Sequence, residues 1–186
     1  MFQKNTEGRV ARILLLAEGF WSFGSGLFLP IFAIFSEKVG GDITDAGIAA
    51  AIFLFATSTL EIFVGRFLDK FKEKWFLVVD YFMESLIFLG YFFVDNKWEL
   101  FALQLFLGIA NAIGDPSWES LYGRHAPKRH SGKHWAFSHL YIGYASALGI
   151  LLGCILVSYF GFGIVFILGS IFSFIAAIVT MFKIKN

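Results

Sequence analysis

Apolar residues dominate six stretches of the chain, and short polar segments separate them. Each stretch is about as long as the roughly 20 residues that an α-helix needs to cross the hydrocarbon core of a bilayer. None alternates polar and apolar residues at every second position, as the strands of a membrane barrel do. The pattern therefore predicts six membrane-spanning helices, at 13–35, 43–67, 75–94, 100–122, 135–159 and 162–182.

Specific residues are expected to break or bend the predicted helices at two places. The last two stretches are nearly continuous, and only Gly161 and Gly163 separate them. One unbroken helix of that length would not fit the membrane, so we expect these glycines to end one helix and begin the next. Pro30 lies within the first stretch and predicts a bend there.

The composition indicates the same class of protein. Of the 186 residues, 58% are hydrophobic and 16% are charged, and 25 are Phe. A soluble domain is usually about half apolar and about one-quarter charged. We therefore expect an all-α transmembrane protein in which residues 1–186 form one six-helix domain, with the lipid bilayer as its solvent.

The positions of the basic residues predict the orientation. All but two of the 15 Lys and Arg residues fall at the two chain ends and in the second and fourth connections. The exceptions, Lys38 and Lys97, lie beside acidic residues on the opposite face. Because cytoplasmic loops carry an excess of Lys and Arg, both termini are expected to be cytoplasmic, in a prokaryotic plasma membrane.

Polar residues form a stripe on the first predicted span. Glu18, Ser22 and Ser25 recur at i, i+4 and i+7, which places them on one helix face. In the second span, Glu61 shares a face with Thr57. Buried carboxyl groups are costly in a bilayer and usually face a wet cavity. The stripe indicates a path for a solute or cation, and polar packing between helices is the alternative.

The fourth predicted span carries a second stripe. Gln104, Gly108, Asn111 and Asp115 recur at i, i+4, i+7 and i+11. The acids of the third span, Asp80 and Glu84, are instead expected to pair with the basic loops, and Glu119 is expected to lie at the membrane interface near Arg124.

Small residues recur at four-residue spacing in the last two spans. Such rows allow helix backbones to approach closely in lipid. They predict either packing within the bundle or a face for another chain. The rows are Ala145, Gly149 and Gly153, and Gly169, Ser173 and Ala177.

No pattern in the sequence indicates catalysis or a cofactor. Gly24-Ser25-Gly26 is the nearest approach to an intramembrane protease nucleophile, and no His lies on the last span. There is no His-Glu-x-x-His motif. The single Cys and the loop histidines lack metal-ligand spacing. We expect no enzyme, no cofactor, no metal site and no nucleic acid partner. His139, about one turn into the fifth span, suits proton relay, but no partner for it is evident.

The connection between the second and third spans has the most specific motif. Gly65 and Asp69 are followed by Lys70 and Lys74. This resembles the signature that major facilitator superfamily (MFS) transporters carry at the same connection. Lys72 stands where that signature has a second Gly, and Glu73 replaces a basic residue.

The fourth span and the loop after it carry weaker similarity to the same family. LQLFLGIANAIGDPSW resembles the family's fourth helix, with Gln104 where an Arg associated with proton coupling commonly precedes Gly108. HAPKRHSGKHW resembles the loop that follows, with Pro127 and Gly132 in place. The resemblance covers the whole chain, but only the N-terminal six of the family's usual twelve helices.

This resemblance implies a fold and a function. The fold is one six-helix half, a 3+3 inverted repeat, and the activity is secondary transport of a small solute by alternating access between two halves. One half has only half a cavity, so the chain forms a homodimer, pairs with a second six-helix chain, or is a fragment. The alternative is a non-transporting membrane partner or a truncated remnant of a transporter.

The resemblance also assigns roles to residues. Helices one and four line the transport cavity in the family, where proton or cation coupling is common, and Trp21 and Trp118 are candidate cavity aromatics. The expected substrate or ion path comprises Glu18, Ser22, Ser25, Glu61, Gln104, Asn111 and Asp115. The expected cytoplasmic gating motif comprises Gly65, Arg66, Asp69, Lys70, Lys74 and Arg124.

Overall fold

The computed structural model describes residues 2–68, 70–127 and 131–184, with side chains from residue 8 onward. The described part of the chain is all-α, as predicted. Short 3-10 helices, η1 (Leu29–Ile31) and η2 (Tyr91–Phe93), extend two of the α-helices. The α-helices are α1 (Phe2–Phe28), α2 (Phe32–Lys38), α3 (Ile43–Leu68), α4 (Glu73–Gly90), α5 (Lys97–His125), α6 (Ser131–Phe160) and α7 (Phe162–Lys183).

The six predicted spans correspond to six long helical units, because α1, η1 and α2 together form the first. Several units extend beyond the predicted ends, since a helix can continue where its polar side chains leave the hydrocarbon. Pro30 lies in η1, where α1 ends, which confirms the predicted bend. Gly161 has a φ of 77° between α6 and α7, a conformation that favours glycine, and this confirms the predicted break.

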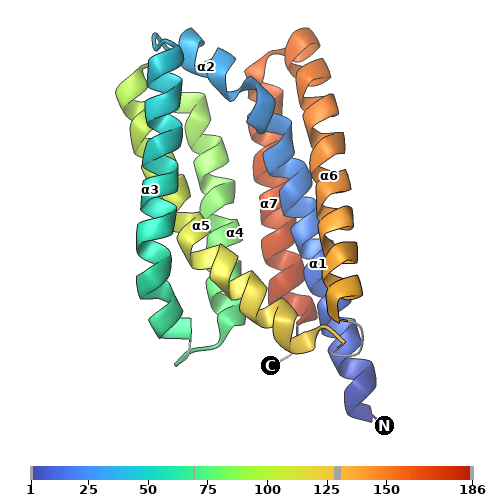
Figure 1. Ribbon diagram of the computed structural model, residues 1–186. Helices are drawn as coiled ribbons and strands as arrows, with labels where there is room; N and C mark the ends of the chain where they lie inside the picture. Colours follow the sequence, from blue (N-terminus) through green and yellow to red (C-terminus); the bar gives the residue numbers. More distant parts are fainter. Residues whose placement is uncertain (1, 69, 128–130, 185–186) are drawn as a thin grey trace.

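Within the described residues, five helical units are long and apolar enough to cross a membrane. The sixth, α5, is not among them because it carries several polar residues. It nevertheless packs along α3 and α4 within the bundle (Figure 1). Gln104 and Asn111 on α5 are buried in the protein. A span with polar residues is tolerated in a membrane when those residues face the interior in this way.

The helices form two groups of three, and one long seam makes the largest contact between them. In Figure 1, α3, α4 and α5 lie together, and α1, α6 and α7 lie beside them. The seam is the contact between α4 and α7. At one end of the bundle the core is aromatic: the ring centroid of Phe28 lies 4.7 Å from that of Tyr91 and 5.4 Å from that of Phe166.

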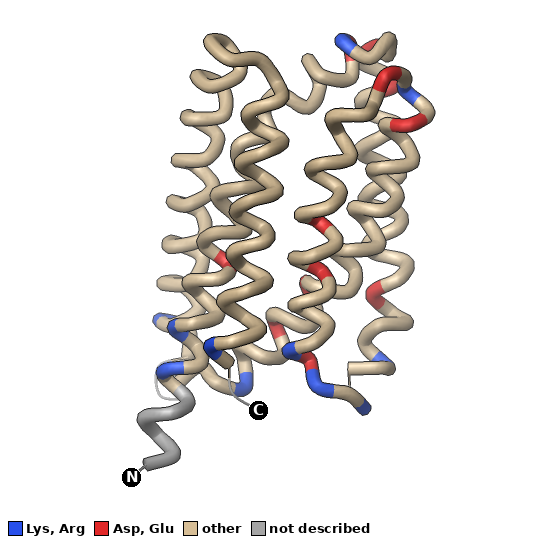
Figure 2. Tube along the Cα trace, turned by 180° about the vertical axis from the view of Figure 1, so that it is seen from behind, with Lys and Arg blue, Asp and Glu red and all other residues tan. Residues whose placement is uncertain are grey.

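Both termini lie at the same end of the bundle (Figure 1), as an even number of crossings requires. Figure 2 shows that most of the described Lys and Arg residues gather at that end. Lys38 ends α2 and Lys97 begins α5, at the opposite end of the bundle (Figure 1), and Lys97 pairs with Asp45 there. The assignment of the basic end to the cytoplasm remains a prediction from the charge rule.

Glycines on α6 allow its backbone to contact that of α1. A Cβ atom at Gly149 would overlap the carbonyl oxygen of Phe23, and one at Gly153 would overlap that of Leu27. On α7, Gly169 meets the ring of Phe88 in the same way. These positions therefore serve packing within the bundle, which was one of the two interpretations of the small-residue rows.

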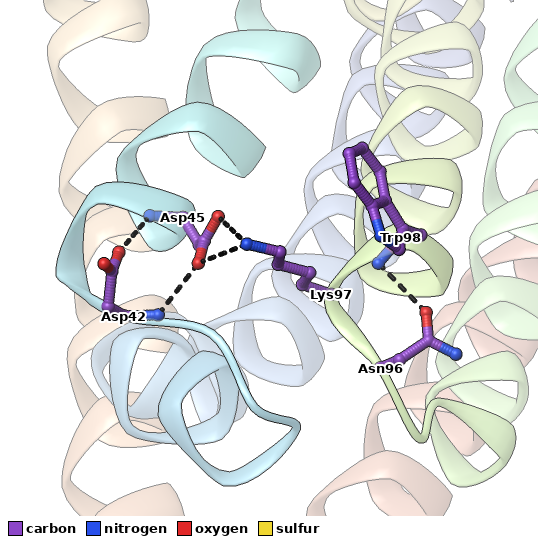
Figure 3. Close-up of polar contacts among 5 residues, drawn as sticks. All are labelled: Asp42, Asp45, Asn96, Lys97 and Trp98. Atoms are coloured by element: carbon purple, nitrogen blue, oxygen red, sulfur yellow. Dashed lines mark hydrogen bonds and ion pairs between the residues drawn. The ribbon is translucent and has the colours of Figure 1, made fainter.

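The end opposite the termini is fixed by a cap on α3 and an ion pair to α5 (Figure 3). The backbone N–H of Asp45 donates to Asp42 at 2.8 Å, and that of Asp42 donates to Asp45 at 3.1 Å. This is the reciprocal arrangement of a capping box. Lys97 Nζ lies 3.1 Å from Asp45 Oδ1. Asn96 caps α5 by accepting from the N–H of Trp98 at 3.0 Å.

The α1–α6 contact leads to a test of packing. Gly149→Ala and Gly153→Ala should each destabilise the purified protein by about 1–3 kcal/mol, because the added methyl group overlaps backbone. Gly143→Ala is the matched control on the same helix, since no atom lies within 4 Å of its Cβ position. Thermal unfolding in detergent, followed by circular dichroism, measures the difference. Equal midpoints for all three variants would contradict this packing.

The cap predicts a dependence of stability on pH. The N–H of Asp45, which donates to the Asp42 carboxylate, lowers the pKa of Asp42 in the folded protein. Because the pKa is lowered, ionised Asp42 stabilises the fold at pH values above its unfolded pKa of about 3.9. The stabilisation is lost as the pH falls through the pKa of Asp42 in the folded protein. Asp42→Ala should therefore lower the unfolding midpoint at pH 7, and the loss should shrink below about pH 4.

Asp42→Asn is the control for this measurement, because asparagine keeps an oxygen that can cap α3. It should retain most of the stability at pH 7. A loss from Asp42→Ala that is the same at pH 7 and at pH 3 would show that the ionised cap does not contribute.

Candidate functional site

Two adjoining cavities lie among the helices, and both are lined by polar residues from the predicted spans. The first, which we call the aromatic cavity, has a volume of about 420 Å³. The second, which we call the acidic cavity, has a volume of about 330 Å³. Ile142 of α6 lines both.

The aromatic cavity lies between the two groups of helices and is lined by residues of both. Its rings come from α1, α2, α3, α4 and η2, and its polar groups from α1, α4, α5 and α6. The rings are those of Trp21, Phe28, Phe32, Phe53, Phe88 and Tyr91. The polar residues are Ser22, Ser25, Glu84, Gln104, Asn111 and Ser146.

Glu84 of α4 is the carboxyl group of the aromatic cavity, and its side chain is only 1% exposed. Asn111 Nδ2 donates to Glu84 Oε1 at 2.7 Å, and Trp21 Nε1 donates to Glu84 Oε2. Among the described residues, the ion pairs are Lys97–Asp45 and Arg124–Glu73. The expectation that Glu84 pairs with the basic loops is therefore wrong: neutral donors from two other helices hold it.

The remaining polar groups of this cavity differ in how they are bonded. Gln104 Nε2 donates to the hydroxyl of Tyr91 at 3.1 Å. The hydroxyl of Ser25 donates within its own helix, to the carbonyl of Trp21 at 3.1 Å. Ser22 is 3% exposed, and its hydroxyl has no hydrogen-bond partner among the described residues. A buried hydroxyl without a partner is costly, and that of Ser22 is covered by other protein atoms.

The acidic cavity lies nearer the end that holds the termini. It is lined by four carboxyl groups and one imidazole, together with Pro116, Trp118 and Ile142. Tyr81 of α4 donates its hydroxyl to Glu18 Oε2 at 2.7 Å. The described residues contain no cluster with metal-ligand geometry. The titratable residues of this cavity are Glu18, Glu61, Asp115, Glu119 and His139.

The predicted substrate or ion path is thus divided between the two cavities. Ser22, Ser25, Gln104 and Asn111 line the aromatic cavity. The three carboxyl groups of the predicted path line the acidic cavity. Both candidate aromatics also lie at these sites, one in each cavity. The role of these residues in transport remains a prediction.

Asp80 is a further buried acid, and it is not expected at this position from the sequence pattern. Its side chain is 3% exposed, and its Oδ1 atom has no hydrogen-bond partner among the described residues. A Cβ atom at Gly114 of α5 would overlap the Asp80 carboxyl group. Gly114 therefore provides the space that this carboxyl group occupies, and the expected pairing of Asp80 with a basic loop is not observed.

The residues of the predicted gating motif make separate contacts. Asp69 lies outside the described residues, so a charge cluster around it remains a prediction. The guanidinium of Arg66 lies 6.0 Å from the ring centroid of Phe63. Lys74 is buried, and its Nζ donates to the carbonyl of Ile184 at 2.6 Å. A Cβ atom at Gly65 would meet no atom within 4 Å.

Arg124 has a partner that the sequence motif does not indicate. Its Nη2 lies 2.7 Å from Oε1 of Glu73, which also accepts from Ser120 at 3.0 Å. Glu73 is the residue that replaces a basic position of the family signature. The pair joins the start of α4 to the end of α5. Glu119, expected at the membrane interface near Arg124, lines the acidic cavity.

Several known proteins are similar to this chain. An uncharacterised MFS-type transporter of Methanocaldococcus jannaschii is 26% identical over 88% of the chain and 42% of its own length. The multidrug resistance protein MdtG of Proteus mirabilis is 27% identical, with the same coverage. MdtG of Salmonella typhimurium is 21% identical over 76% of the chain and 36% of its own length. The chain thus spans less than half the length of these relatives.

The sequence also matches the Major Facilitator Superfamily over residues 14–186. The match begins at the first predicted span and includes all the helices that line the two cavities. The structure and the similarity together show an integral membrane protein of a transporter family. The chain belongs to the major facilitator superfamily.

Proposed function

We propose that this chain transports a small solute by alternating access, as a six-helix half that works with a second six-helix unit. The observation that carries the proposal is the position of the polar stripes. All seven residues of the predicted path line one of two cavities that adjoin at Ile142. Polar groups that share a continuous path within a membrane bundle are the usual mark of solute or ion movement.

The pairing of the helices supports the inverted repeat that alternating access uses. In an inverted repeat, α1 would correspond to α5, α3 to α6, and α4 to α7. The α1–α6 contact would then correspond to α5–α3, and the α1–α7 contact to α5–α4. Both of these pairs are in contact. This correspondence leaves the α4–α7 seam unchanged. A pseudo-two-fold relation of this kind is what two inverted repeats would produce.

The relatives support a requirement for a second unit. The chain covers 42% of the length of the transporters from M. jannaschii and P. mirabilis. A second six-helix unit, in a second copy of the chain, in another chain or in the same polypeptide, would close the open side of the cavities. The name of the MdtG relatives supports an organic solute. The acids of the acidic cavity would couple its movement to protons or another cation.

The transport path predicts an effect of two carboxyl groups. Solute uptake into vesicles should fall at least tenfold in the double variant Glu18→Gln/Asp115→Asn, because both groups line the acidic cavity. Glu37→Gln/Asp95→Asn is the matched control, with two exposed acids outside both cavities. Fluorescent organic solutes in everted membrane vesicles provide the measurement. Uptake that is equal in wild type and the Glu18/Asp115 variant would contradict the assignment.

The need for a second unit predicts association. Crosslinking in native membranes should trap either a dimer of this chain or a complex with another six-helix unit, unless both units lie in one polypeptide. Size measured by gel electrophoresis after crosslinking separates these cases. A strictly monomeric six-helix species that still transports would overturn the proposal of two units.

A further inference from the structure

We propose that the aromatic cavity binds an organic cation with an apolar body, and that Glu84 determines the preference for positive charge. This inference rests on the proposed function, because the cavity belongs to the proposed transport path. It names a substrate class and a specificity-determining residue that the polar stripes of the sequence do not indicate.

Charge in the cavity has one sign. Among the residues that the structure describes, Glu84 is the only acidic residue in the lining, and the lining contains no Lys, Arg or His. Its two oxygens accept from Asn111 and Trp21, which are neutral donors. A buried carboxyl group that is held only by neutral groups has no counter-ion for its ionised form. A positively charged solute would supply one and would gain an attraction that is stronger in a low-dielectric site than in water.

The acidic cavity also carries carboxyl groups. It contributes four carboxyl groups and shares Ile142 with the aromatic cavity. An anion that entered either cavity would approach carboxyl groups with no cationic side chain in the lining to compensate, apart from the imidazole of His139. Transfer of such an ion from water is costly, so anionic solutes are disfavoured.

The aromatic walls suit the apolar part of such a solute. Trp21, Phe88 and Tyr91 come from three different elements and line the same space as Glu84. The ring centroid of Tyr91 lies 4.7 Å from that of Phe28 and 6.3 Å from that of Phe88. Aromatic faces attract cations through the negative charge of the ring face and also bury apolar groups. The volume of about 420 Å³ lies within the range of small-molecule sites.

The bonding of the polar groups argues against a sugar-like solute. A polyol needs many free donors and acceptors around it. Here the hydroxyl of Ser25 is bonded to its own helix, and the amide of Gln104 is bonded to Tyr91. The hydroxyl of Ser22 is buried and unpaired. Among the described residues, the hydroxyls of Ser22 and Ser146 form no hydrogen bond, and these two hydroxyls and one carboxyl group beside aromatic rings fit an amphiphilic cation better than a polyol.

A pair of ions of similar shape and opposite charge tests this inference on the unaltered full chain. Tetraphenylphosphonium should show saturable binding to the protein in lipid nanodiscs, above the binding to empty nanodiscs. Tetraphenylborate should bind at least tenfold more weakly by the same equilibrium dialysis. Because this comparison uses the wild-type chain, it does not depend on how any variant folds. Equal affinity for the two ions, or tighter binding of tetraphenylborate, would overturn the inference.

Variants then assign the preference to one residue. Glu84→Gln should weaken tetraphenylphosphonium binding at least tenfold, whereas Glu84→Asp, which keeps the charge, should keep the preference for the cation. Glu37→Gln is the matched control, an exposed glutamate on α2 outside both cavities. Circular dichroism checks that each variant is folded. Unchanged cation binding by folded Glu84→Gln would overturn the role of Glu84.

This inference and the proposed function can fail separately. Cation binding that depends on Glu84, without any solute movement in the vesicle assay, would support the inference and contradict transport. Transport of neutral or anionic solutes by a chain that does not bind tetraphenylphosphonium would support transport and overturn the substrate class.

Discussion

A carboxyl group inside a membrane must find partners within the protein, and Glu84 shows how this chain meets that requirement. Glu84 lies on α4, and its donors lie on α1 and α5. Of these helices, α4 and α5 belong to one three-helix group of the bundle, and α1 belongs to the other. The hydrogen bond from Trp21 therefore joins the two groups at the wall of the aromatic cavity, and the bond from Asn111 holds the same carboxyl group within its own group. The stability of the bundle and the geometry of the aromatic cavity therefore both depend on Glu84.

Much of the fold follows from local sequence. Apolar run length predicts the spans, and single residues such as Pro30 and Gly161 determine where helices bend or end. Helical periodicity also identifies the polar faces of α1 and α5, because a stripe is a property of one helix. The cavities that these stripes line could thus be anticipated without knowing how the helices pack.

The acids of α4 could not be interpreted in this way, because their environment is set by distant residues. Glu84 depends on Trp21 and Asn111, and Asp80 depends on the absence of a side chain at Gly114. The sequence of a single helix does not predict these contacts with other helices. The useful signal was simpler: two acids lie one turn apart in a long apolar span, where the cost of burial makes an interior position more favourable than contact with lipid.

The helix α4 also bears on how the bundle moves. At its start, Glu73 binds Arg124 of α5, and Lys74 binds the carbonyl of Ile184 just after α7. Further along α4, Glu84 accepts hydrogen bonds from α1 and α5. The hydroxyl oxygen of Ser85 lies 3.0 Å from that of Ser170 on α7. Contacts in several directions along one helix oppose sliding of its neighbours. A bundle that is tied in this way favours motion as one body, which is the property that the proposed rocking against a second unit would require.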